Sequence, residues 1–116
     1  MNIVLIGGHP KGYEIPFHPK TRSGKIIRKL ANEIGIEPEY FDLWDNQKEE
    51  DSRVLSSKTL KRLKKIQRDK TRIIALGRYI EKVLIDNGYG CHYLPHPASR
   101  DKKYLEILKK GLIKIK

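Results

Sequence analysis

A single histidine, His96, stands between two prolines in residues 94–100, which read Leu-Pro-His-Pro-Ala-Ser-Arg. Neither proline can donate a main-chain hydrogen bond, and each pushes the residue before it towards an extended conformation. Because the stretch follows a short apolar run, we expect a stiff loop at the carboxyl end of a strand, the edge where open α/β sheets bind their ligands. An imidazole there can donate a hydrogen bond to a ligand. The alternative is a plain connecting loop in which His96 is only a polar residue.

A glycine-rich segment follows the first apolar run of the chain. Residues 2–7 are mostly β-branched residues and leucine, which predicts a buried strand of a parallel sheet. Gly7, Gly8 and Gly12 then allow tight turns and a close approach of the backbone to a ligand. Residues 13–22 contain two further prolines and predict a long ordered loop, a kind of loop that is often functional in small domains.

The composition favours a polyanionic partner. The chain has 116 residues, enough for one small domain, and its formal net charge is +11. Such an excess favours nucleic acid first and an acidic membrane surface second, although lysine-rich surfaces also serve solubility. The single cysteine, Cys91, excludes an internal disulfide and argues against a cysteine-ligated metal. The sequence shows no basic leader and no long apolar segment, so we expect a soluble cytoplasmic protein, without membrane contact, that is a monomer.

Four apolar runs, each followed by a helical pattern, predict the fold. Strands are expected at residues 2–7, 39–43, 71–76 and 91–94, and helices at caps formed by Ser23, by Ser56 or Ser57, by Gly77 and by Asp101. This alternation predicts a single domain, residues 1–116, built as a three-layer α/β/α sandwich around a central four-stranded parallel sheet. Right-handed crossovers would bring the loops that follow the strands to one edge, where they form a single cleft.

Three further segments carry charge or alternating residues. We interpret the acidic run that includes Glu49, Glu50 and Asp51 as a solvated loop. Residues 112–116 alternate between apolar and basic, which indicates a short edge strand or a frayed tail. Residues 58–72 are the most basic part of the chain. Such a run is usually a solvated helix face, and the net charge favours the alternative that it faces phosphates.

Several familiar cofactor motifs do not match the sequence. Residues 23–25 read Ser-Gly-Lys, but Ile26 follows them and Pro19 stands where a phosphate-binding loop needs its first glycine. The glycines of the first loop lack the spacing of a dinucleotide-binding fingerprint. The four histidines are too scattered to indicate a metal site. We therefore expect no metal and no cofactor.

The order of the remaining motifs resembles the uracil-DNA glycosylase superfamily over nearly the whole chain. The similarity is greatest to its thermostable bacterial and archaeal branch, whose four iron–sulfur cysteines this chain lacks. A Leu-Gly-Arg-Tyr unit followed at this spacing by the Leu-Pro-His-Pro loop is the most specific part. In chain order, the motifs are residues 5–10 (Leu-Ile-Gly-Gly-His-Pro), 16–17 (Pro-Phe), 23–27 (Ser-Gly-Lys-Ile-Ile), Asn46, 73–79 (Ile-Ile-Ala-Leu-Gly-Arg-Tyr) and 94–100.

This resemblance implies a metal-free DNA glycosylase that flips uracil or another altered base out of DNA and excises it. It implies that Phe17 stacks on the base, that Asn46 reads the amide edge of the base, and that His96 donates a hydrogen bond to the 2-carbonyl oxygen of the departing anion. The other implied site residues are Gly7 and Gly8 against the base, and Lys11, Ser23, Ser99 and Arg100 against phosphates. His9, an unusual residue for its place in the first loop, is a further catalytic candidate that in its neutral form could orient water.

The first loop departs from the pattern of the superfamily. Members carry an acidic residue or asparagine where this chain has Gly8 and His9, neither of which offers a negative charge to a cationic sugar. Glu14 lies a few residues further on, and Ala98 stands where serine is usual. Two other functions therefore stay open: a degenerate member that binds DNA or a base without cleaving it, and a hydrolase of free nucleosides or nucleotides. A flavodoxin-like domain with an unrelated ligand is the remaining alternative.

Overall fold

Four apolar runs form the parallel sheet that the sequence predicts. A computed structural model describes residues 2–99 and 101–115 and contains β1 (Ile3–Gly7), β2 (Glu39–Asp42), β3 (Arg72–Leu76) and β4 (His92–Leu94). All three pairings are parallel, and the strand order is β2-β1-β3-β4. The two central strands are buried along nearly their whole length, which agrees with their runs of isoleucine, valine and leucine.

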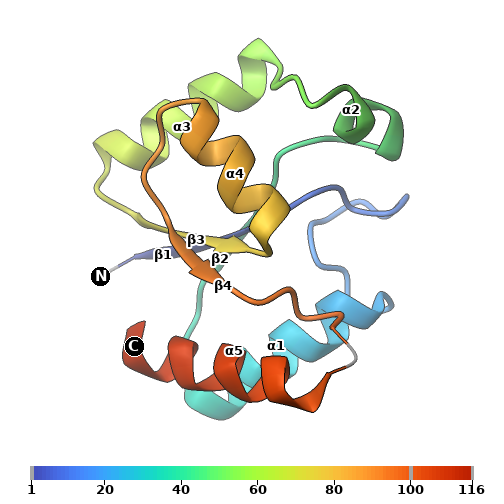
Figure 1. Cartoon of the computed structure of the whole chain (residues 1–116), viewed down its shortest axis with the longest axis vertical. Helices are drawn as coiled ribbons and strands as arrows, with labels where there is room; N and C mark the ends of the chain where they lie inside the picture. The colour runs from blue at the N-terminus through green and yellow to red at the C-terminus, as the bar shows by residue number, and fades with distance from the viewer. Residues whose placement is uncertain (1, 100, 116) are drawn as a thin grey trace.

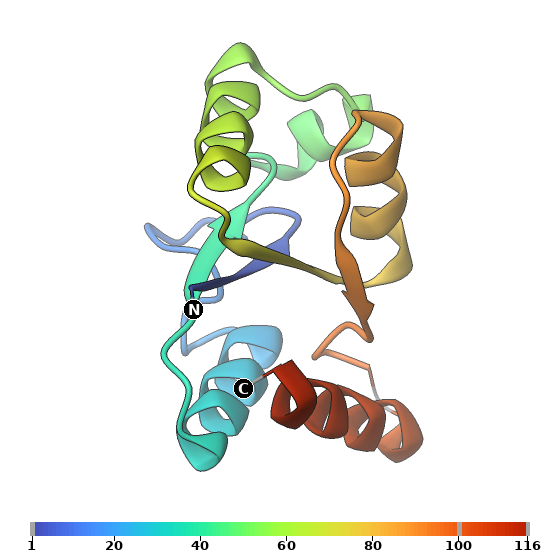
Figure 2. The same ribbon diagram turned by 90° about the vertical axis from the view of Figure 1, so that its left-hand side faces the viewer.

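Helices cover both faces of this sheet (Figure 1). In the described part of the chain they are α1 (Arg22–Ile34), α2 (Gln47–Ser52), α3 (Ser57–Arg68), α4 (Arg78–Asp86) and α5 (Lys102–Ile115). Helices α1 and α5 lie next to each other on one face, whereas α3 and α4 lie on the other, with α3 on the β2 side and α4 on the β4 side (Figure 2). No helix among the described residues is long and apolar enough to cross a membrane.

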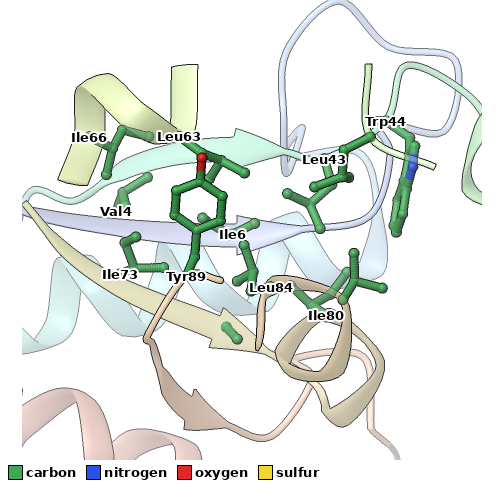
Figure 3. Packing of buried hydrophobic residues seen from close by; sticks show 13 residues of the cluster. Val4, Ile6, Leu43, Trp44, Leu63, Ile66, Ile73, Ile80, Leu84 and Tyr89 are labelled. Atoms are coloured by element: carbon green, nitrogen blue, oxygen red, sulfur yellow. The ribbon is translucent and has the colours of Figure 1, made fainter. Parts of the chain in front are cut away.

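The two faces of the sheet bury separate apolar clusters. Alternate side chains of β1 point to opposite faces, so Val4 and Ile6 belong to one cluster while Ile3 and Leu5 belong to the other. The first cluster packs the sheet against α3 and α4, and Figure 3 labels Leu63, Ile66, Ile80, Leu84 and Tyr89 among its members. The second packs the sheet against α1 and α5 through residues that include Ile27, Leu108 and Leu112. The sheet is therefore held from both sides.

The acidic run after β2 is a helix, α2, and the prediction of a loop there is wrong. The side chain of Asn46 accepts a hydrogen bond from the backbone N–H of Glu49 at 2.9 Å, and the Glu49 carboxylate accepts one from the backbone N–H of Asp45 at 2.8 Å. Two N–H groups at the start of the helix are thus satisfied by a pair of side chains three residues apart, much as in a capping box. This local capping allows a short helix with no buried residue to form.

Two other local predictions need correction. Residues 112–115 continue α5 and form no strand, because Leu112 lies one helical turn after Leu108 and both are fully buried against the sheet. Helix α1 is capped by Thr21, whose hydroxyl oxygen accepts a hydrogen bond from the backbone N–H of Gly24 at 3.0 Å. Ser23 is instead a buried residue of the first turn. The helix ends at Gly35, whose φ angle of 83° lies in the left-handed region that favours glycine.

The strand order creates a switch point at the carboxyl edge of the sheet. After β1 the chain enters α1 on one face, whereas after β3 it enters α4 on the opposite face (Figure 1). Because β1 and β3 are neighbours, the two connections diverge and leave a crevice above the ends of these strands. The loop after β4, which contains His96, reaches the same edge, since the backbone N–H of Gly77 donates to the carbonyl of Leu94 at 2.8 Å.

Candidate functional site

A pocket of about 190 Å³ lies at this edge, and we call it the carboxyl-edge pocket. Its walls come from the loop after β1, the end of β2, the start of α1, helix α2 and the loop after β4. The lining residues are Gly8, His9, Pro10, Lys11, Phe17, Thr21, Ser23, Asp42, Gln47, Glu50 and His96. A protein cavity of about 150 Å³ holds one benzene molecule. The carboxyl-edge pocket therefore has room for one six-membered ring.

Most of the predicted site residues meet in this pocket. His96, His9, Gly8, Phe17, Lys11 and Ser23 all line it, although they are spread over 89 positions of the sequence (8–96). Asn46 does not line it, because its side chain caps α2. Ser99 lies outside as well, and its hydroxyl accepts a hydrogen bond from the backbone N–H of Asp101 at 3.4 Å. Arg100 is outside the described residues.

His96 lines the pocket and keeps one ring N–H that is not used by its own loop. Its Nδ1 accepts a hydrogen bond from the backbone N–H of Ala98 at 3.0 Å, so the neutral ring carries its proton on Nε2. The ring rests beside Gly77, where a Cβ atom would come within 3.6 Å of the His96 Cβ atom. Loss of solvation beneath the surrounding loops lowers the pKa of His96, and the nearby Lys11 ammonium acts in the same direction. Around neutral pH His96 is thus an uncharged donor, although part of the side chain is exposed.

His9 is tied into a network with α2 and is not free to bind water. Its Nδ1 accepts a hydrogen bond from the backbone N–H of Lys11 at 3.1 Å, and its Nε2 lies 2.9 Å from the Gln47 Oε1 atom. The neutral ring with its proton on Nε2 satisfies both contacts. The Gln47 side-chain amide donates in turn to Glu50 at 3.2 Å and to Asp51 at 2.8 Å. His9 therefore holds α2 against the first loop.

Glu50 of α2 occupies the space that a side chain at position 8 would fill. A Cβ atom built on Gly8 would collide with the Glu50 Oε1 atom. The first loop has no acidic residue at positions 8 and 9, but the Glu50 carboxylate lies beside Gly8. It comes from α2, 42 positions later in the sequence. Sequence reasoning missed this because the acidic run was interpreted as a solvated loop. The signal available was the spacing between Asn46 and Glu49, which is typical of a helix start.

Asp42 is a pocket residue that the sequence analysis did not single out. It is the last residue of β2, pairs in register with Gly7, and lines the pocket. Its Oδ2 atom is the one buried side-chain nitrogen or oxygen among the described residues that lacks a hydrogen-bond partner. Burial raises the pKa of Asp42 to about 7; His9 opposes this shift, and the Glu50 carboxylate adds to it. The only available signal was a charged residue next to the last position of the strand expected at residues 39–43.

Phe17 forms one apolar wall of the pocket in a strained backbone conformation. Its φ angle of 50° is unusual for a residue other than glycine, and its side chain is 6% exposed. Arg28 fixes this conformation by donating hydrogen bonds to the carbonyls of Phe17 at 2.6 Å and Pro16 at 2.9 Å. The ring approaches Gly7 so closely that a Cβ atom there would lie 2.5 Å from the Phe17 Cζ atom. Gly24 likewise leaves room for the backbone carbonyls of Phe17 and His18.

Comparison with models of protein families, with curated proteins and with solved structures finds no match to this chain. Its function must therefore be argued from the carboxyl-edge pocket and the surfaces around it.

Proposed function

We propose that the chain is a DNA glycosylase of the uracil-DNA glycosylase type, which takes uracil or another altered base into the carboxyl-edge pocket and hydrolyses its glycosidic bond. The helices on both faces of the sheet would then form the three-layer sandwich of that superfamily. The observation that carries the proposal is the meeting of His96, Phe17 and two carboxylates around a pocket of one-ring size. The net charge of +11 supports DNA as the partner.

Phe17 and His96 take the roles that the resemblance implies. The buried Phe17 ring stacks on the flipped base, since aromatic side chains accept any base through its flat face. The neutral His96 donates its Nε2 hydrogen to the 2-carbonyl oxygen of the base. As the glycosidic C–N bond breaks, its electron pair moves onto the base, and this hydrogen bond strengthens with the developing negative charge.

Asp42 takes over the reading of the base from Asn46. When protonated, a carboxyl group offers one donor and one acceptor, as a side-chain amide does. Uracil presents the complementary N–H and carbonyl on one edge. The orphaned Asp42 Oδ2 atom gains a partner when the base enters, and the pKa of about 7 keeps a large part of Asp42 protonated near neutrality.

Glu50 supplies the negative charge that the first loop lacks. A cation-like sugar is stabilised by a carboxylate close by, and the same group accepts a proton from the water that adds to the sugar carbon. His9 acts through Gln47 as a positioning residue for Glu50 and does not itself contact the water.

The test uses end-labelled oligonucleotides with one uracil, either single-stranded or opposite guanine or adenine. Wild type, His96→Ala and His92→Ala are incubated with them, and hot alkali then cuts at abasic sites. His92 is the matched control because it is an exposed histidine of β4 outside the pocket. We expect cleavage by wild type and by His92→Ala, with a loss of at least about 100-fold in His96→Ala, the effect of removing one such donor.

The other outcomes separate the alternatives. No cleavage at high protein concentration, together with salt-sensitive binding of the same oligonucleotides, would contradict excision and favour the module that binds DNA without cleaving it. Neither cleavage nor binding would contradict a DNA substrate altogether and point to free nucleosides. Equal cleavage by His96→Ala and His92→Ala would remove His96 from the mechanism.

A further inference from the structure

Helix α3 carries six basic residues and no acidic one within twelve positions. None of these six forms an ion pair among the described residues, where the two ion pairs, Arg78–Glu81 and Lys82–Asp86, both lie on α4. Like charges crowded on one helix repel each other and weaken it. An uncompensated cluster of this kind is what a bound polyanion would neutralise. The basic residues of α3 are Lys58, Lys61, Arg62, Lys64, Lys65 and Arg68.

Four of these cations form a single stripe along a groove. Lys58, Lys61, Arg62 and Lys65 recur at helical spacing, so they share one face of α3. All four are exposed and line a depression of about 640 Å³, which we call the α3 groove. The apolar side of α3, in contrast, faces the core through Leu63 and Ile66. The stripe is thus held in place by packing on the opposite side of the helix.

Aromatic residues of the edge strand β2 also line the α3 groove. Tyr40 and Phe41 are both half-buried there. The Phe41 ring packs on the α3 side of the sheet, with the Arg62 guanidinium carbon 5.6 Å from its centre, whereas Tyr40 packs on the opposite face. Cations next to an aromatic ring are what proteins use to hold single-stranded nucleic acid, through its phosphates and its bases respectively.

The α3 groove adjoins the carboxyl-edge pocket. Pro10 and Asp42 line both. A strand that lies in the groove therefore has a base within reach of the pocket. Three carboxylates, Glu14, Asp42 and Asp45, also line the groove but come from outside α3. Their negative charges repel phosphates from the side of the groove on which they lie, so phosphates bind more favourably along α3.

We propose that the α3 groove binds the sugar–phosphate backbone of a single DNA strand, next to the nucleotide whose base enters the carboxyl-edge pocket. This inference rests on the proposed function for the base, but the groove itself can be tested without catalysis. From Lys58 to Lys65 the helix rises about 10 Å, and stacked nucleotides follow one another at about 3.4 Å. The stripe spans about three phosphates.

The test compares two variants that lose the same charge. The stripe variant carries Lys58→Gln, Lys61→Gln, Arg62→Gln and Lys65→Gln. The control variant carries Lys29→Gln, Lys109→Gln, Lys110→Gln and Lys114→Gln, which are exposed residues of α1 and α5 on the opposite face of the sheet. Each protein is titrated with a short fluorescein-labelled oligothymidylate over a range of KCl concentrations. Oligothymidylate contains no uracil, so excision does not affect the measurement.

We expect the stripe variant to lose at least about tenfold in affinity and to show a weaker salt dependence. Each phosphate contact on a single strand contributes about 0.7 to the slope of log K against log salt, so the loss of three contacts lowers the slope by about 2. The control variant keeps most of its affinity for the oligonucleotide and most of its salt dependence. Circular dichroism checks that both variants are folded.

An equal change in the two variants, or no change in the stripe variant, would overturn the inference. So would binding of the wild type to phosphatidylserine vesicles with no binding to the oligonucleotide. These outcomes are distinct from failure of the proposed function. If wild type excises uracil but the stripe variant binds DNA normally, the proposed function is supported and binding in the α3 groove is contradicted. If nothing is excised but the stripe variant alone loses DNA binding, binding in the groove is supported and excision is contradicted.

Discussion

The two ends of the sheet carry pockets of very different character. At the amino edge, Asn2, Arg72 and Lys114 are among the residues that line a pocket of about 470 Å³, more than twice the volume of the carboxyl-edge pocket. None of the described residues around it is a histidine, and no buried side-chain polar atom there lacks a partner. Two carboxylates line each pocket, but only the smaller one holds two histidines and the orphaned Asp42 Oδ2 atom. The histidines and the unpartnered carboxylate oxygen therefore gather at the carboxyl ends of the strands, and not at the larger cavity.

The difference between the ends has a physical cause. In a parallel sheet the carboxyl ends of all strands meet at one edge, so loops from distant parts of the chain converge there. At this edge of the protein, polar groups are held together at a cost in stability: Phe17 has a strained backbone and Asp42 is partly buried.

The largest expected effect is on stability as a function of pH. Asp42 has a pKa of about 7 in the folded chain against 3.8 without burial, so between these pH values the folded state keeps a proton that the unfolded state has lost. The free energy of unfolding therefore falls as pH rises through this window, by up to about 4 kcal/mol. Urea unfolding of wild type and of Asp42→Asn from pH 4 to 8 measures this fall. The free energy of unfolding of Asp42→Asn is subtracted from that of wild type, so that the contribution of His96, present in both proteins, cancels. A difference that does not change with pH would contradict the burial of the Asp42 carboxyl group.

A second effect concerns excision by variants of Asp42. Asp42→Leu removes both hydrogen bonds to the base, and at about 1.5 kcal/mol for each we expect a loss of about 100-fold in rate. Asp42→Asn keeps one donor and one acceptor, so it retains activity. Wild-type activity declines above about pH 7 as Asp42 ionises, whereas the rate of Asp42→Asn stays level there. Single-turnover rates from pH 6 to 9 decide between these cases, and a fully active Asp42→Leu would exclude Asp42 from base recognition.

A smaller effect is expected from Gly8→Ala. The added methyl group displaces the Glu50 carboxylate, which lies at the end of a flexible side chain, so the fold tolerates the change. We expect a loss of about tenfold in excision rate, or roughly 1.4 kcal/mol of transition-state stabilisation. Gly90→Ala is the control because no other atom lies within 4 Å of the added methyl group. Equal rates for the two variants would show that Glu50 has no role in the reaction.

The amino edge supplies the smallest effect. Arg72→Gln and Lys114→Gln alter the walls of the larger pocket but leave the carboxyl edge unchanged. We expect excision rates within about twofold of wild type, because surface substitutions outside a site change stability by only about 0.5 kcal/mol. A large loss of excision rate in either variant, measured in the same single-turnover assay, would contradict the placing of the reaction at the carboxyl edge.

The sheet could be predicted because its signals are local. Short stretches of sequence set the backbone conformation of their own segments. Examples are the apolar runs of β1 and β3, the glycine after α1 and the two prolines around His96. The meeting of His96, His9, Phe17 and Gly8 followed from strand polarity alone. Helix α2 was missed because its charged residues hid the cap formed by Asn46.

The chemistry of the pocket depends on distances that no local pattern contains. Glu50 fills the space above Gly8, although 42 positions separate the two residues in sequence. The pKa of Asp42 depends on burial by other elements, and a strand that ends in aspartate is ordinary in sequence. The role expected for Asn46 was misplaced for the same reason: its side chain is used by its own helix. Local patterns fix backbones, whereas the partners of polar groups depend on tertiary packing.

The proposed function requires that a base binds at the carboxyl edge, and an NMR titration detects such binding without any chemistry. Free uracil is added to ¹⁵N-labelled protein while backbone amide shifts are followed. We expect saturable shifts at Gly8, which lines the pocket, and at Ala98, whose N–H binds the His96 ring, with none at Ile3 or Arg72 of the amino edge. Shifts confined to the amino edge, or no shifts at millimolar uracil, would show that the carboxyl-edge pocket does not bind the base.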